Sequence, residues 1–138
     1  MPDNYYLIRL TLNQINVSKK FLQIVQADGG FEALSTTDAR RPDLLIFELG
    51  DNHQKDINLV QSLLEGDDVG EVFLTSESVD PAVLMQAMRI GVKEFISQPI
   101  SENEVRQAFE GFRARQSRSV KPRPNKNGKI ISIFGSKG

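Results

Sequence analysis

The strongest constraint on the fold is the alternation of short apolar segments with segments of helical period. Five segments are rich in β-branched and aromatic residues, as strands buried in a sheet are; they span residues 5–12, 31–37, 43–49, 71–75 and 94–97. A stretch with apolar residues every three to four positions follows the first, third, fourth and fifth of them. Strands separated by helices are typical of parallel sheets covered on both faces. We therefore expect an α/β fold with a doubly wound, parallel, five-stranded sheet.

Capping residues mark the ends of these helices. The signals are a Gly29–Gly30 stop, Asp56 as an N-cap, Asp80 before Pro81, and a capping box formed by Ser101 and Glu104.

The second crossover is too short for this pattern. Only residues 38–42 separate the second strand from the third, whereas a parallel crossover needs about ten or more residues. Either the second helix is shortened or missing, or the second strand is placed or oriented differently.

Composition excludes several kinds of site. The 138 residues allow one compact domain with a tail. They contain no cysteine, so a thiolate nucleophile and a zinc ribbon are both excluded. His53 is the only histidine, and its polar surroundings indicate an exposed side chain without a role, so no metal site or Ser-His-Asp site is expected. The pair Asp67 and Asp68 is expected to form a solvated turn. No apolar run of about 20 residues and no signal peptide is present, so we expect a cytoplasmic protein without direct membrane insertion.

Charge is distributed unevenly. Residues 1–112 carry all 18 acidic side chains but only 9 of the 17 basic ones, and residues 113–138 carry the other 8 basic ones. An acidic domain repels nucleic acid, so we expect no nucleic-acid partner. Residues 117–129 have two prolines and almost no apolar side chain, which predicts a basic flexible linker after a domain spanning residues 1–116.

Three segments together resemble the receiver domains of response regulators. Residues 42–49 (PDLLIFEL) resemble their third strand, residues 72–76 (VFLTS) their fourth, and residues 87–100 (AMRIGVKEFISQPI) the segment that ends in a lysine-proline pair. The third segment is specific in its length, its spacing and its aromatic residue. The resemblance implies a flavodoxin/CheY-like fold.

The residues that carry the family's phosphotransfer chemistry are largely replaced. That chemistry uses two acids after the first strand and an acceptor aspartate to hold Mg²⁺, with a Thr or Ser and a Lys on the phosphate oxygens. Here residues 4–27 contain no acid, Glu48 stands at the acceptor position and Gln98, before Pro99, stands at the lysine position, while Thr75 is retained. The resemblance therefore implies a degenerate phosphoacceptor pocket with no catalytic residue and no metal.

Two alternatives remain for Glu48, and two for Phe95. Glu48 either imitates a phosphorylated aspartate or is simply a polar residue at a strand end; the second is favoured, because a neutral pocket offers the carboxylate little to pair with. Phe95 occupies the place of the family's switch aromatic, coupled to Thr75, but an ordinary core position is favoured.

The last residues resemble the beginning of another domain. Residues 128–138 (GKIISIFGSKG) resemble the strand and the first letters of the deviant Walker A motif of ParA/MinD ATPases, with Gly135, Lys137 and Gly138 as nucleotide-binding residues of a full-length protein. We expect residues 130–138 to begin an ATPase domain that continues beyond this sequence. ATP and Mg²⁺ are expected for that domain and no cofactor for this chain.

An atypical receiver before a MinD-like ATPase is the layout of CpaE/TadZ proteins of Flp (tad) type IV pilus assembly. The resemblance implies a phosphorylation-incompetent, non-enzymatic domain that recognises proteins of a pilus or secretion machinery, recruits the ATPase to a polar or membrane-associated site, or forms a homodimer. Met85 and Met88 are candidate interface residues. The alternative is a functional receiver domain in two-component phosphorelay signalling.

Overall fold

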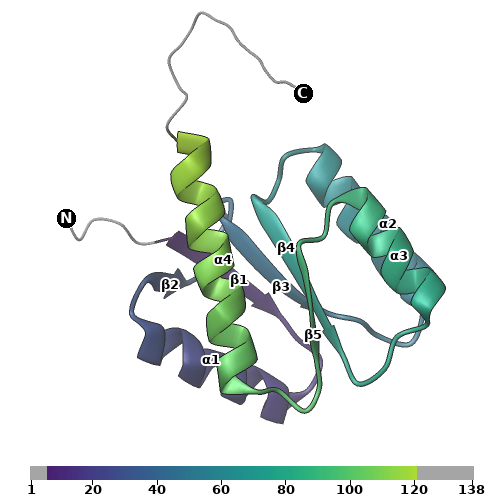
Figure 1. Cartoon of the computed structure of the whole chain (residues 1–138), viewed down its shortest axis with the longest axis horizontal. Helices are drawn as coiled ribbons and strands as arrows, with labels where there is room; N and C mark the ends of the chain where they lie inside the picture. The colour runs from purple at the N-terminus through teal and green to yellow at the C-terminus, as the bar shows by residue number, and fades with distance from the viewer. Residues whose placement is uncertain (1–5, 121–138) are drawn as a thin grey trace, which may run out of the picture. The chain divides into compact units, whose positions relative to one another are not determined.

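The computed structural model describes residues 6–120 and confirms the five-stranded parallel sheet. The strands are β1 (Tyr6–Thr11), β2 (Phe31–Ala33), β3 (Leu44–Glu48), β4 (Glu71–Ser76) and β5 (Glu94–Ser97), in the order β2-β1-β3-β4-β5 (Figure 1). All four neighbouring pairs are parallel. Strand β2 is shorter than predicted, because only its first three residues pair with β1.

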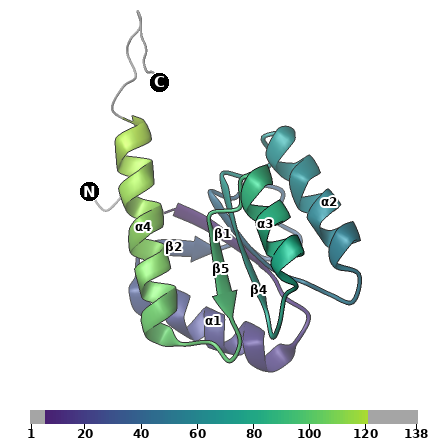
Figure 2. The same ribbon diagram turned by 45° about the vertical axis from the view of Figure 1, so that its right-hand side comes forward.

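The described helices are α1 (Ile15–Asp28), α2 (His53–Glu65), α3 (Pro81–Ile90) and α4 (Glu102–Val120). Helices α2 and α3 lie side by side on one face of the sheet, and α1 lies on the other (Figures 1 and 2). This division follows from the strand order. The connection from β1 to β2 and the connections from β3 to β5 run in opposite directions along the sheet, and right-handed crossovers in opposite directions place their helices on opposite faces.

Most of the predicted caps are confirmed. Gly29 ends α1 with a φ of 80°, and the Asp80 carboxylate accepts a hydrogen bond from Ala82 N at the start of α3. The prediction for α2 is wrong, since Asn52 is the N-cap and accepts from Lys55 N at 3.0 Å. Asp56 lies within the first turn and instead accepts a hydrogen bond from Gly50 N at 2.6 Å, which anchors the loop after β3.

The short second crossover contains no helix. Residues 34–43 connect β2 to β3 without one, and both strands lie parallel on either side of β1, which decides between the two alternatives. Leu34 N donates to Ile8 O and Asp43 N donates to Leu7 O, so both ends of the connection are attached to β1. A segment that only steps across one strand does not need the length of a helix.

The core of the sheet is buried on both faces. Every residue of β3 and β4 is buried, as expected for central parallel strands. On the face covered by α2 and α3, the buried cluster joins the side chains Leu45, Phe47, Ile57, Val60, Val69, Val72, Leu74, Ala87 and Val92. The sheet thereby forms a rigid base for the loops that follow its strands.

The chain divides into two compact units at Arg106, within α4. The helix runs to Val120, so the predicted linker of residues 117–129 is wrong at its beginning. Residues 117–120 are Ser, Arg, Ser and Val, which helices tolerate, and the next proline along the chain is Pro122. The rest of the linker and the predicted nucleotide-binding residues lie outside the described part of the chain.

Within residues 6–120, none of the helices combines the length and the apolar character needed to span a bilayer.

Candidate functional site

The candidate site lies at the carboxyl ends of the parallel strands, where ligands of doubly wound sheets bind. Glu48 is the last residue of β3 and is only 4% exposed. Thr75 of β4 pairs in register with Glu48, and Gln98 follows β5 directly. Asn13 and Gln14 complete the site from the loop between β1 and α1. The sheet order therefore brings together four segments that are far apart in the sequence.

The Glu48 carboxylate is fully hydrogen-bonded. Its Oε1 accepts from Asn13 N at 2.7 Å and Gln14 N at 3.2 Å. Its Oε2 accepts from Gln14 Nε2 at 2.7 Å and from Gln98 Nε2 at 3.1 Å. The expectation that a neutral pocket offers Glu48 little to pair with is therefore wrong. The donors are uncharged amide groups. The lack of a cation near Glu48 therefore does not leave its carboxylate without partners.

These donors keep Glu48 ionised. Burial alone would raise its pKa, because a carboxylate loses its hydration when it is buried. The hydrogen bonds from Asn13, Gln98 and Gln14 favour the charged form, and their combined effect holds the pKa of Glu48 below its ordinary value of 4.5. The site thus contains a fixed negative charge at neutral pH.

Thr75 links this carboxylate to β5. Its Oγ1 donates to Ile96 O at 2.7 Å and accepts from Gln98 Nε2 at 3.3 Å, and the residue is completely buried. The Gln98 amide thus bridges Glu48 and Thr75. Phe95 is half-buried and packs against the core beneath α2 and α3, while Pro99, joined to Gln98 by a cis peptide bond, is exposed.

The geometry does not suit a divalent cation. Mg²⁺ is bound through oxygen ligands, usually with more than one carboxylate or phosphate among them. The groups that face the Glu48 oxygens are N–H donors, whose partial positive charge repels a cation. Among residues 6–120 there is no group of three or more Asp, Glu, His or Cys side chains placed to hold a metal. The Mg²⁺ on which phosphotransfer depends therefore has no matching set of ligands around Glu48.

The other candidate residues lie apart from this site. Met85 and Met88 are 56% and 42% exposed on α3, and His53 is half-buried at the start of α2. Asp67 and Asp68 are exposed in the turn after α2, as predicted; Asp67 adopts a positive φ of 57°, and its carboxylate also pairs with Arg41 at 2.7 Å.

Sequence reasoning missed Asn13 and Gln14 as site residues. They carry no charge, but their place directly after the first strand, at the edge where Glu48 ends its own strand, would have been the signal.

Comparisons with known proteins agree with this architecture. The family model described as response regulator receiver domain matches residues 2–110. The chemotaxis protein CheY of Listeria monocytogenes is 21% identical over 108 residues, which are 78% of this chain and 91% of that protein. A response regulator from Thermotoga maritima superposes with a TM-score of 0.69 at 13% identity, over 80% of this chain and 98% of that one. A putative pilus assembly-related protein from Burkholderia pseudomallei superposes with a TM-score of 0.66 at 12% identity, over 83% of this chain and 93% of that one.

Proposed function

Because the chain belongs to the response regulator receiver domain family, we propose that it is a receiver domain whose output does not depend on phosphorylation and that it acts by binding another protein. The observation that carries this proposal is the Glu48 carboxylate, with both oxygens occupied by amide donors where the family's chemistry requires an acceptor and a metal.

Glu48 also supports a fixed state of the domain. In this proposal its carboxylate, one methylene longer than that of an aspartate, takes the place of a phosphorylated side chain, and Gln98 couples it to Thr75. Thr75 is held onto β5 by its hydrogen bond to Ile96 O. The fold then presents one constant surface to its partner rather than switching between two.

The finer proposal concerns the parent protein. We place the domain at the N-terminal side of a CpaE/TadZ-like pilus assembly ATPase, with proteins of that machinery as partners. The structural likeness to a pilus assembly-related protein and the Walker-A-like residues 128–138 support this assignment. The exposed Met85 and Met88 remain the proposed contacts of a homodimer.

The test is the response to phosphoryl donors. We expect the amide NMR spectrum around Thr75 to stay unchanged when Mg²⁺ is added with acetyl phosphate or with beryllofluoride. A variant that restores the family's groups, with Asn13→Asp, Gln14→Asp, Glu48→Asp and Gln98→Lys, is the matched control for the assay. Saturable, metal-dependent shifts in the unmodified domain would instead support the alternative, a working receiver in a phosphorelay.

A further inference from the structure

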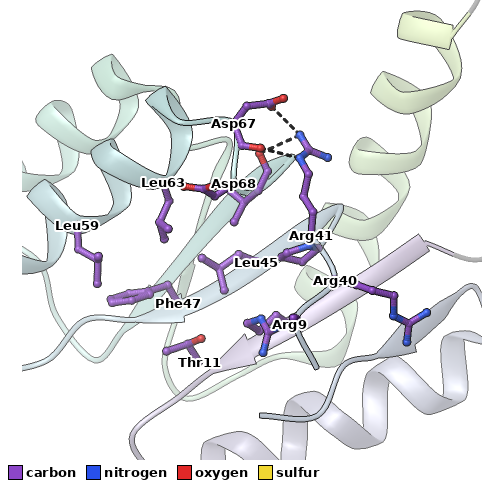
Figure 3. A pocket seen from close by; sticks show the side chains of 13 residues that line it. Arg9, Thr11, Arg40, Arg41, Leu45, Phe47, Leu59, Leu63, Asp67 and Asp68 are labelled. Carbon is purple, nitrogen blue, oxygen red and sulfur yellow. Dashed lines mark hydrogen bonds and ion pairs between the residues drawn. The ribbon is translucent and has the colours of Figure 1, made fainter. Parts of the chain in front are cut away.

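A cavity of about 500 Å³ lies beside the crossover that lacks a helix (Figure 3). Its floor is formed by Leu45 and Phe47 of β3, and Leu59 and Leu63 of α2 form one wall. This volume is in the range of protein binding pockets, about 300–1,000 Å³. We call this cavity, with those four leucine and phenylalanine side chains as its apolar lining, the crossover groove.

The strand order explains why the groove is there. The step from β2 to β3 runs in the same direction along the sheet as the steps from β3 to β4 and from β4 to β5. A right-handed crossover would therefore place its helix on the face that carries α2 and α3, above β1 and β3. Residues 34–43 contain no helix, so the layer beside α2 is incomplete at this position.

The lining repeats the geometry of a helix-packing site. Leu59 and Leu63 are four positions apart and so lie on one stripe of α2. Across the sheet, Thr11 pairs in register with Phe47, and Arg9 pairs with Leu45, so these side chains project from the same face. Leu59 is 47% exposed although it lies beside this apolar floor.

The charges are concentrated at one end of the groove. Three arginines and two aspartates lie at the end where α2 terminates: Arg9, Arg40, Arg41, Asp67 and Asp68 (Figure 3). Thr11 and Leu59 lie towards the other end. Arg41 is paired with Asp67. The Arg9 side chain donates hydrogen bonds to the backbone oxygens of Ser35 and Asp38. The Asp38 carboxylate attracts it electrostatically, but no carboxylate within residues 6–120 forms a direct ion pair with it. Arg9 can therefore still pair with an incoming acid.

We propose that the crossover groove binds an amphipathic α-helix of a partner protein, which fills the position of the absent crossover helix. Its apolar side chains, spaced three or four residues apart, rest against Leu59, Leu63 and Phe47. It runs in the same direction as α2, as a crossover helix would, so that its C-terminal turn lies at Arg9. Acidic residues and the negative end of the helix dipole are both favoured there. This inference rests on the proposed protein-binding function and names the surface that carries it.

The experiment is a selection of helical peptides from a display library against the domain. We expect the selected peptides to carry apolar residues at helical spacing and acidic residues in the last turn. They should bind Leu59→Asp and Thr11→Trp variants at least about tenfold more weakly than the unmodified domain, because one adds a charge to the wall and the other fills the cavity. Arg9→Met should weaken binding about threefold or more. Leu22→Asp, the same change at an exposed leucine of α1 on the opposite face of the sheet, is the control and should bind normally.

Several results would overturn the proposal. They are the absence of any enriched peptide, binding that survives both groove variants, binding that is lost with Leu22→Asp, and a preference for basic residues in the last turn. A dimer of the unmodified domain that Leu59→Asp dissociates would show that a second copy, not a partner helix, occupies the groove. Circular dichroism identifies a variant that does not fold. If one of the two groove variants is unfolded, the other still tests the proposal.

The two proposals fail separately. Spectral shifts at Thr75 with Mg²⁺ and beryllofluoride would contradict phosphorylation independence and leave peptide binding unaffected. Failure of peptide binding would contradict the groove assignment alone.

Discussion

The side chain of Gln98 donates to the carboxylate of Glu48 across 3.1 Å, and the same Gln98 nitrogen lies 3.3 Å from the Thr75 hydroxyl oxygen. A neutral amide thus connects three strand ends at the position where the family's chemistry uses a charged lysine. An amide orients a carboxylate through a hydrogen bond but cannot neutralise the charge of a transferring phosphoryl group. The arrangement therefore suits a constant site better than a catalytic one.

Replacing Glu48 tests whether its hydrogen bonds support the fold. Glu48→Gln places an NH₂ group against at least one of the present donors, so we expect a loss of about 1–3 kcal/mol in the free energy of unfolding at pH 7. Urea denaturation measures the change. Glu77→Gln, at an exposed position, is the control and should be neutral within about 0.5 kcal/mol. Equal stabilities of the two variants would contradict the assignment.

The lowered pKa of Glu48 predicts a pH dependence with a defined sign. A carboxyl group whose pKa is lower in the folded than in the unfolded state contributes stability that is complete above the unfolded-state pKa. That contribution disappears as the pH falls through the lower, folded-state pKa. The stability difference between the unmodified domain and Glu48→Gln should therefore be constant near neutrality and shrink below pH 4.5, the ordinary value for Glu. Urea denaturation at a series of pH values checks this, and a difference that grows on acidification would contradict it.

A second acid beside Glu48 should create a need for a cation. Gln14→Asp removes the donor that lies 2.7 Å from Glu48 Oε2 and adds a like charge, which raises the pKa of Glu48 and destabilises the domain at pH 7. We expect millimolar MgCl₂ to restore part of the loss, raising Tm by about 2–4 °C. Thermal unfolding with MgCl₂ and with KCl of equal ionic strength separates metal binding from screening. The neutral Gln14→Asn variant should show no such rise.

Thr75 should matter for stability through its hydroxyl group. Thr75→Val keeps the shape of the side chain but leaves the buried Ile96 O without the hydroxyl donor at 2.7 Å, so we expect a loss of about 1–3 kcal/mol. Thr75→Ser keeps the hydroxyl and should lose less. Chemical denaturation of both variants is the measurement, and a larger loss for Thr75→Ser than for Thr75→Val would assign the effect to the methyl group instead.

The elements of the fold were largely predictable from local sequence. The apolar segments that became β3 and β4 and the capping signal at Asp80 depend on short-range preferences that tertiary contacts reinforce. The N-cap of α2 was misplaced because Asp56 has the right chemistry for a cap, whereas its carboxylate is used by Gly50 N across the loop. The extent of α4 was misjudged because a lack of apolar residues does not by itself end a helix.

The candidate site was only half predictable. Glu48, Thr75 and Gln98 were found through the resemblance of three segments to receiver domains, and each stands at or next to the end of a strand. Asn13 and Gln14 were not found, because a backbone N–H and a neutral amide leave no distinctive signal in a sequence. The crossover groove was not predicted either. The short second crossover indicated a shortened or missing helix, but not that a cavity would remain in its place.

The sequence by itself determined that this chain alternates strands with helices and that the acids for Mg²⁺ are absent after the first strand. Those properties depend on residue type and local spacing. Only the tertiary structure decided that Glu48 is a fully hydrogen-bonded anion and that a groove opens beside α2. Both depend on which segments the parallel sheet brings side by side, and that is set by long-range pairing rather than by neighbouring residues.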